Sequence, residues 1–200
     1  MDLDEYISKL KSSSATPGGG SASAISSMFA ASLNSMASLL SIGKKKLAPY
    51  EDHFKRISGE SDSIIGELKI LSGEDEKAFQ GIMDALHMEK SDSGRVNAIN
   101  MAIKKSVQVS WKIAGISLHN MENAVFLGEY GNMNLVTDDL SAAYMAYTAV
   151  HTSVNNIKIN LKFQKEEDYR EEELLKLRFF METVECTMDR ARKIENSIIP

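Results

Sequence analysis

Proline is almost absent from this chain, and its scarcity limits the possible folds more than any other feature. The 200 residues contain three prolines, at positions 17, 49 and 200. Proline interrupts a helix because its nitrogen lacks a hydrogen-bond donor and its ring clashes with the preceding turn. A chain with so few prolines is free to form long helices. We therefore expect uninterrupted helices over most of the sequence.

Apolar residues recur with the period of a helix along the chain. Leu3, Tyr6, Ile7 and Leu10 follow the i, i+3, i+4, i+7 spacing and predict a short amphipathic first helix. Further helices are predicted over residues 21–42, 49–88, 91–126, 138–161 and 166–194. No useful stretch alternates as a strand does. The predicted fold is all-α: one domain over residues 1–200, an up-and-down bundle of five to six helices.

The predicted second helix is unusual because no charged residue occurs from Ser21 to Ile42. Such a segment is long enough to cross a bilayer. It also contains eight serines and Asn34, and its apolar residues are mostly alanine and methionine. Those polar groups disfavour a membrane span. We expect a buried helix whose small residues let neighbouring helices approach closely.

Bulk properties exclude some classes of function. The net charge of −5 gives no general attraction to nucleic acid or to anionic membranes, and the one basic run is three lysines long. The single cysteine, Cys186, fits a reducing compartment. The first ten residues lack the apolar core of a signal peptide. We expect a cytoplasmic protein.

A glycine-rich loop separates the first two predicted helices, at Pro17, Gly18, Gly19, Gly20 and Ser21. Glycines let a ligand approach the backbone closely. Free N–H groups at the start of the next helix favour a carboxylate or phosphate. The loop lacks the Gly-Lys-Ser/Thr ending of a nucleotide P-loop and no strand precedes it. Alone, it suits an anion-binding nest and a simple tight connection equally well.

Lysines follow the predicted second helix directly, at Lys44, Lys45 and Lys46. They have two interpretations: they stabilise the helix C-terminus, or they bind the carboxylates of a ligand. The four histidines show no spacing of three or four residues. A helical metal site is therefore not expected.

Four more polar residues are candidates for a site. Asp75 lies within a predicted helix, and Asp138 begins another, where a helix-capping role is the simpler interpretation. Asn132 lies in the predicted loop at 128–137. Asn160 lies on an apolar helix face, where its alternative role is a hydrogen bond between helices.

In this order, five motifs resemble the cyclodeaminase domain of formiminotransferase-cyclodeaminase and the related methenyltetrahydrofolate cyclohydrolases. They are Thr16-Pro17-Gly18-Gly19-Gly20-Ser21, Gly43-Lys44-Lys45-Lys46, Asp75-x-x-Ala78-Phe79, Gly131-Asn132-x-Asn134-x-x-Thr137-Asp138 and Asn156-Ile157-x-Ile159-Asn160. The resemblance extends from about residue 3 to residue 190. Two positions depart from the family pattern. Met88-Glu89-Lys90 lacks a proline that is common there, and Thr137 stands where serine is commoner.

The resemblance implies an enzyme of folate one-carbon metabolism that needs neither a metal nor a permanently bound cofactor. One reaction converts 5-formiminotetrahydrofolate to 5,10-methenyltetrahydrofolate and ammonia. The alternative hydrolyses 5,10-methenyltetrahydrofolate to 10-formyltetrahydrofolate. The resemblance slightly favours the cyclodeaminase, with a separate formiminotransferase as a partner. A non-catalytic helical dimerisation module is the alternative from a different class.

The resemblance also suggests roles for the candidates. Asp75 is the first choice for the general acid and base, and Asp138 the second. Asn132 and Asn160 would orient the pterin or the one-carbon group. The glycine-loop residues, from Pro17 to Ser21, and Lys44 to Lys46 would hold the p-aminobenzoyl-glutamate tail of a reduced folate, polyglutamylated or not.

Helix length separates these candidates. A helix over residues 21–42 spans roughly 33 Å, at about 1.5 Å per residue. The glycine loop and Asn160 then lie at one end of an alternating bundle, and the lysines, Asn132 and Asp138 at the other. A two-fold antiparallel dimer would bring the two sets together. We therefore expect a homodimer with the site near the subunit interface.

Overall fold

The computed structural model describes residues 2–198, and all the regular structure in that range is helical. The α-helices are α1 (Leu3–Leu10), α2 (Gly19–Leu39), α3 (Glu51–His87), α4 (Arg95–Tyr130), α5 (Val136–Phe163) and α6 (Glu167–Asn196). Two short 3₁₀ helices, η1 (Lys45–Tyr50) and η2 (Met133–Leu135), precede α3 and α5. The predicted all-α fold is confirmed.

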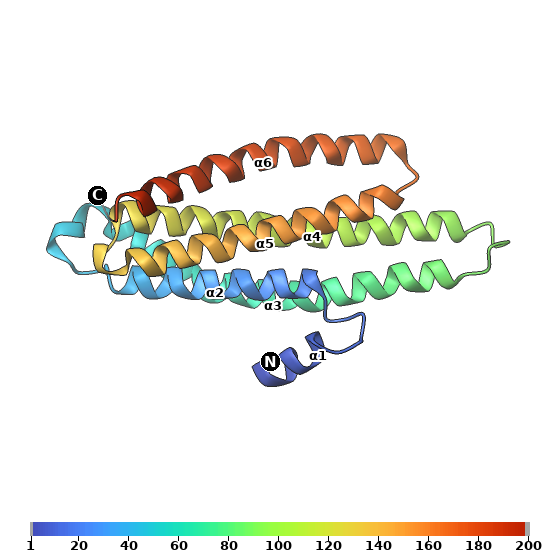
Figure 1. The fold of residues 1–200 in the computed structure, drawn as a ribbon, viewed down its shortest axis with the longest axis horizontal. Helices are drawn as coiled ribbons and strands as arrows, with labels where there is room; N and C mark the ends of the chain where they lie inside the picture. The colour runs from blue at the N-terminus through green and yellow to red at the C-terminus, as the bar shows by residue number, and fades with distance from the viewer. Residues whose placement is uncertain (1, 199–200) are drawn as a thin grey trace.

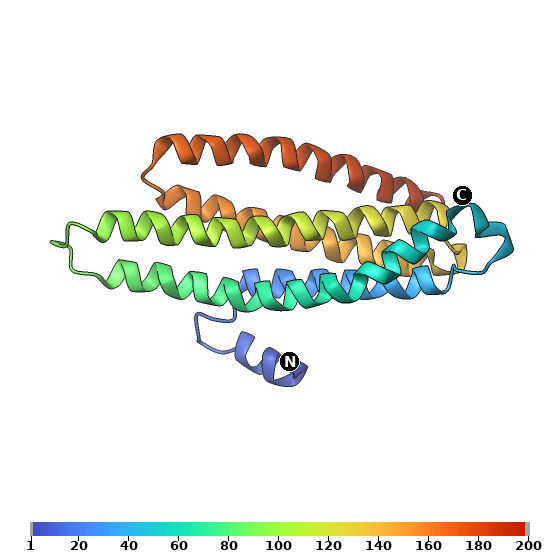
Figure 2. The same cartoon turned by 180° about the vertical axis from the view of Figure 1, so that it is seen from behind.

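Four long helices, α2 to α5, lie side by side with alternating direction and form the body of the bundle (Figure 1). Helix α2 packs against α3, α4 and α5, while α6 packs mainly on α4 and α5. Helix α1 stands away from the body near the start of α2 in both views (Figures 1 and 2). None of the residues of α1 is buried.

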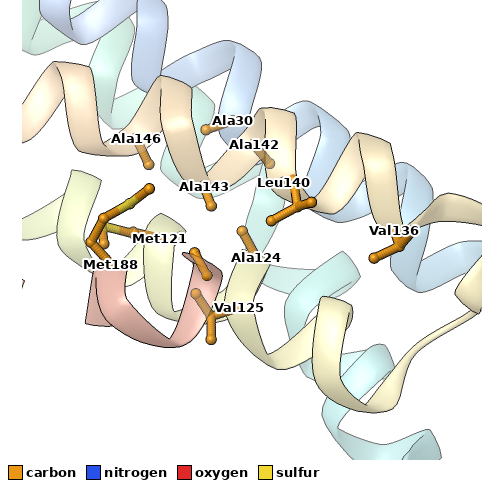
Figure 3. Packing of buried hydrophobic residues seen from close by; sticks show 11 residues of the cluster. Ala30, Met121, Ala124, Val125, Val136, Leu140, Ala142, Ala143, Ala146 and Met188 are labelled. Atoms are coloured by element: carbon orange, nitrogen blue, oxygen red, sulfur yellow. The ribbon is translucent and has the colours of Figure 1, made fainter. Parts of the chain in front are cut away.

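Small side chains hold the core helices close together. Figure 3 shows one cluster, in which Ala142, Ala143 and Ala146 of α5 face the other helices and are almost completely buried. Met121 of α4 and Met188 of α6 lie in the same cluster, both with no exposed surface. Flexible methionines fill the irregular spaces that the alanines leave. The uncharged α2 is buried along much of its length, as expected, including Ser21, Ser23, Ser27 and Ser38.

Two helices end at residues other than those predicted, and a glycine lies near each of these ends. Helix α2 ends at Leu39, and a turn continues to Gly43, whose φ of 76° favours glycine. Helix α4 runs through Gly128 to Tyr130, so the predicted loop at 128–137 was too long. Gly128 serves packing instead, because a Cβ there would lie 3.1 Å from the Ile194 side chain of α6.

Candidate functional site at the glycine-loop end

A cavity of about 490 Å³ opens where the glycine loop meets α3, α4 and α5. Gly18, Gly19 and Gly20 form one side of it, and Asp75 and Phe79 of α3 face them. Much of the remaining wall is apolar, from isoleucines on α3, α4 and α5 and from Phe163. Asp75 is the single ionisable side chain among the described residues that line the cavity.

The Asp75 carboxylate lies directly against the first turn of α2. Helix α2 has Gly18 as its N-cap, so it lacks a side-chain cap of its own. The Asp75 carboxylate accepts a hydrogen bond from the backbone N–H of Ser21 and so caps α2 from a neighbouring helix. A Cβ at Gly20 would overlap this carboxylate. The motif therefore needs glycine at position 20 for close approach.

The pKa of Asp75 is raised above its ordinary value of 3.8. Burial is the largest cause, because it disfavours the charged form, and the neighbouring charge of Glu76 acts in the same direction. The Ser21 amide opposes both by stabilising the carboxylate. Such a group exchanges a proton more readily near neutral pH than an exposed aspartate does.

Amide and hydroxyl groups form a second polar part of the wall. Asn160 of α5 donates a hydrogen bond to the Ser106 hydroxyl of α4, at 3.0 Å between Nδ2 and Oγ. Asn156 lies on the same wall one turn earlier. Ser106 was missed in the sequence, where its one signal is a polar residue between the apolar Ile103 and Val107. The bond to Ser106 also agrees with the alternative role predicted for Asn160.

The remaining members of the predicted site are divided as the helix lengths require. Pro17 is buried and Ser21 lies behind the cavity wall with no exposed surface. Lys44, Lys45, Lys46 and Asn132 line a separate open hollow at the other end of α2. Asp138 lies nearby, in the first turn of α5. Within one chain, these residues do not reach the Asp75 cavity, since α2 and α3 are both unbroken.

A second buried carboxyl group, Asp139, was not predicted. It is 3% exposed, and its Oδ1 has no hydrogen-bond partner among residues 2–198. Burial, followed by the charge of Asp138, raises the pKa of Asp139 from 3.8 to about 7. It lies beside Gly128 and lines none of the cavities described above. In the same described range, no three His, Cys, Asp or Glu residues are grouped as a metal site requires.

Comparison with known proteins identifies the group to which this arrangement belongs. The family model for formiminotransferase-cyclodeaminase matches residues 2–178. The chain belongs to this family. The membership confirms the resemblance carried by the five motifs. None of the helices within residues 2–198 combines the length and apolarity that crossing a membrane requires.

Relatives in the formiminotransferase-cyclodeaminase family include enzymes of two kinds. A methenyltetrahydrofolate cyclohydrolase from Methylorubrum extorquens is 30% identical over 179 residues, covering 88% of this chain and 86% of that protein. A formimidoyltransferase-cyclodeaminase from Gallus gallus is 27% identical, covering 85% of this chain but 32% of that longer protein. The crystal structure of formiminotetrahydrofolate cyclodeaminase from Thermotoga maritima superposes with a TM-score of 0.91, at 26% identity, covering 100% of this chain and 98% of that one.

Proposed function

We propose that this protein is a folate one-carbon enzyme, a formiminotetrahydrofolate cyclodeaminase that acts in the Asp75 cavity. One observation carries the proposal: among residues 2–198, Asp75 is the single ionisable side chain that lines a mostly apolar cavity, and it faces the glycine loop. An apolar cavity with a few placed polar groups is the usual form of a small-molecule site. Its apolar walls suit the flat pterin and p-aminobenzoyl rings.

The charge of the cavity fits the chemistry of this substrate. A formimino group on N5 is an amidine, which carries a positive charge when protonated, and the methenyl product is also a cation. Neither lysine, arginine nor histidine is among the described residues that line the cavity. The Asp75 carboxylate would therefore stabilise both cations, and the shielded site would strengthen that attraction.

One carboxyl group is sufficient for the proton transfers of cyclodeamination. N10 attacks the formimino carbon of the protonated amidine, so that the C–N10 bond forms and the C=N π bond breaks, which leaves an amino group on that carbon. Asp75 accepts the proton that N10 loses. Asp75 then returns this proton to the former imino nitrogen, the C–N bond breaks, and ammonia leaves. The one-carbon unit remains as the methenyl bridge between N5 and N10. The raised pKa of Asp75 suits a group that must act first as a base and then as an acid.

Groups around Asp75 would hold the substrate for this reaction. The first hydrogen bond within α2 joins the Ala22 amide to the Gly18 carbonyl, so the amides of Gly19 and Gly20 have no acceptor inside the helix. These two residues line the cavity with Asn160. We propose that the Gly19 and Gly20 amides and the Asn160 side chain form hydrogen bonds with the carbonyl group and the ring nitrogens of the pterin. Correct placement of N10 against the one-carbon unit would supply much of the catalysis.

Hydrolysis of 5,10-methenyltetrahydrofolate is the second candidate, favoured by the likeness to the Methylorubrum extorquens cyclohydrolase, which the chain covers over 86% of its length. In that reaction Asp75 would take a proton from water as the water oxygen bonds to the methenyl carbon. Asp75 then returns this proton to N5 as the C–N5 bond breaks, the hydroxyl proton passes to solvent as the formyl carbonyl forms, and 10-formyltetrahydrofolate results. The same carboxylate serves both reactions.

Parallel assays distinguish the two reactions. Purified protein is given 5-formiminotetrahydrofolate, and both ammonia and methenyl absorbance are followed; separately, loss of methenyl absorbance is followed with 5,10-methenyltetrahydrofolate at a pH where its spontaneous hydrolysis is slow. We expect ammonia and methenyl product to appear together in the first assay. Activity in the second assay alone would identify a cyclohydrolase. Absence of both activities, with no reduced-folate binding by calorimetry, would favour the non-catalytic dimerisation module.

The outer face of α2 supports a homodimer. Phe29, Met36, Leu39 and Leu40 are between 36% and 59% exposed, on a helix that has no charged residue to keep that face in water. An exposed apolar strip of this length marks an interaction surface. A second copy is the occupant we propose, because pairing two α2 helices antiparallel places the cation-free cavity of each copy beside the lysine end of the other.

Such a dimer would complete the folate site. The glutamate tail of folate is anionic, and the part of the chain that the structure describes places no cationic side chain in the wall of the Asp75 cavity. Lys44, Lys45 and Lys46 of the partner subunit would bind that tail, whether or not it is polyglutamylated. Light scattering tests the assembly: Phe29→Glu with Met36→Glu should give monomers. The control is Phe179→Glu, an exposed position on α6, which packs mainly on α4 and α5; this variant should stay dimeric. A separate cytoplasmic formiminotransferase would supply the substrate.

A further inference from the structure

Helix α1 is attached to the bundle in an unusual way. Its apolar side chains Leu3, Ile7 and Leu10 are 50%, 49% and 38% exposed, so apolar packing contributes little to holding it. Within residues 2–198, one side-chain hydrogen bond joins α1 to the bundle. The Tyr6 hydroxyl donates it to Ser21 Oγ, at 3.2 Å.

The acceptor of this bond belongs to a small cluster of buried polar groups. Ser21 Oγ lies 2.7 Å from Ser72 Oγ and 3.4 Å from a carboxylate oxygen of Glu76. Because the Ser21 hydroxyl has one proton, donation to Glu76 leaves its oxygen to accept from both Tyr6 and Ser72. Tyr6 therefore supplies one of the two donors that orient the Ser21 hydroxyl.

Ser21 connects this cluster directly to the candidate catalytic group. Its hydroxyl binds Tyr6, and its backbone N–H binds the Asp75 carboxylate. Tyr6 is close enough that the charges of Glu76 and Asp75 add to burial in raising the pKa of its hydroxyl. The middle of α1, the start of α2 and the middle of α3 thus meet at Ser21.

We propose that Tyr6 is a positioning residue, which latches α1 over the start of α2 and keeps Ser21, and through it Asp75, in a shielded arrangement. The expected effect on turnover rests on the proposed function, whereas the expected effect on the shielding of Asp75 does not. Tyr6 does not line the cavity, so it has no contact with substrate to lose. Its effect must pass through Ser21.

Loss of the Tyr6 hydrogen bond should lower the pKa of Asp75. Without the Tyr6 hydroxyl, α1 is free to leave the surface, and water reaches Ser21, Glu76 and the back of Asp75. Because burial is the main cause of the raised Asp75 pKa, better solvation lowers that pKa. The Asp75 carboxylate would then be a weaker base toward N10, and a smaller fraction of it would be protonated at neutral pH for transfer to the departing nitrogen.

The test compares Tyr6→Phe with a matched control, Tyr144→Phe. Tyr144 also donates a hydrogen bond from its hydroxyl, in this case to Glu195, but does so on the exposed surface of α5. We expect Tyr6→Phe to lower kcat/KM at neutral pH roughly threefold to tenfold, the value of one neutral hydrogen bond. The acidic limb of its pH profile should move to lower pH. Tyr144→Phe should change neither.

Two measurements need no folate turnover and so separate this inference from the proposed function. Carbon-13 NMR titration of the Asp75 carboxyl should give a lower pKa in Tyr6→Phe than in the wild type, and trypsin should cleave after Lys9 and Lys11 faster. In a Ser21→Ala background, Tyr6→Phe should have no further effect on the Asp75 titration. An unchanged Asp75 pKa, or the same shift with and without Ser21, would overturn the inference even in an active enzyme.

Discussion

Asp75, which is half-buried, and Asp139, which is buried, are two carboxyl groups toward opposite ends of the same bundle. Burial raises the pKa of both. Asp75 accepts a hydrogen bond from the Ser21 amide and faces a cavity, whereas one oxygen of Asp139 has no hydrogen-bond partner among residues 2–198, and Asp139 lines neither the Asp75 cavity nor the hollow at the lysines. A raised pKa is thus common to Asp75, the candidate catalytic group, and to Asp139, whose ionisation destabilises the fold. Asp75 differs from Asp139 in two ways: a cavity beside it has room for a ligand, and the Ser21 amide donates a hydrogen bond that orients its carboxylate.

The largest expected effect comes from removing the acid and base function of Asp75. Asp75→Asn keeps the shape of the side chain but exchanges no proton, so kcat should fall by roughly 10²–10⁴-fold, the usual contribution of general acid–base catalysis. Steady-state assays with both folates measure the loss. Asp139→Asn is the matched control and should keep wild-type turnover. Near-normal turnover by Asp75→Asn would remove Asp75 from the mechanism.

Gly20→Ala tests the position of Asp75 without changing its chemistry. The new Cβ would overlap the carboxylate, so Asp75 must turn away from the Ser21 amide. A misplaced catalytic group costs about 10²-fold in rate, and kcat/KM should fall by that order. Gly43→Ala is the control at the other end. The φ of Gly43 is 76°, a backbone conformation that alanine disfavours, so Gly43→Ala should lower stability by about 1 kcal/mol. A Cβ at this position meets no atom within 4 Å, so turnover should stay unchanged.

The pH dependence of stability should reveal Asp139. Its pKa is about 7 in the folded protein and near 3.8 in the unfolded chain. The folded state holds the proton of Asp139 more tightly than the unfolded chain does, so protonation of Asp139 stabilises the fold. This stabilisation is fully present below pH 3.8 and is lost as the pH rises through about 7. Asp139→Asn cannot ionise, so at pH 8 it should exceed the wild type by about 2–4 kcal/mol in unfolding free energy.

Urea unfolding at pH 5 and pH 8 measures this difference. The advantage of Asp139→Asn should be smaller at pH 5, where the wild type has lost less of the contribution. Asp138→Asn is a useful second variant, because the charge of Asp138 is the smaller cause of the raised Asp139 pKa. It should recover only part of the stability at pH 8. An equal gain at both pH values would show that ionisation of Asp139 is not the cause.

The sequence predicts the helices well because proline scarcity and apolar spacing are local signals. It also predicts which end of the bundle holds Gly20 and Asn160, since that follows from helix length and alternating direction. Ser106 and Asp139 were missed for a physical reason. Their surroundings are set by contacts between α4, α5 and α6, and nothing in the neighbouring residues shows whether a polar group inside a helix faces a cavity or a packed core.

The smallest expected effect concerns the lysine end. Replacing Lys44, Lys45 and Lys46 together with glutamine should raise KM about tenfold and leave kcat unchanged, because surface charges that hold a tail bind the ground and transition states equally. Mixed dimers then show which copy supplies them. Co-expression of this variant with Asp75→Asn should recover roughly a quarter of wild-type activity at low folate, since half the dimers would contain one intact site. Lysines acting within their own chain would give no recovery, because every site in the mixed dimer would carry one defect.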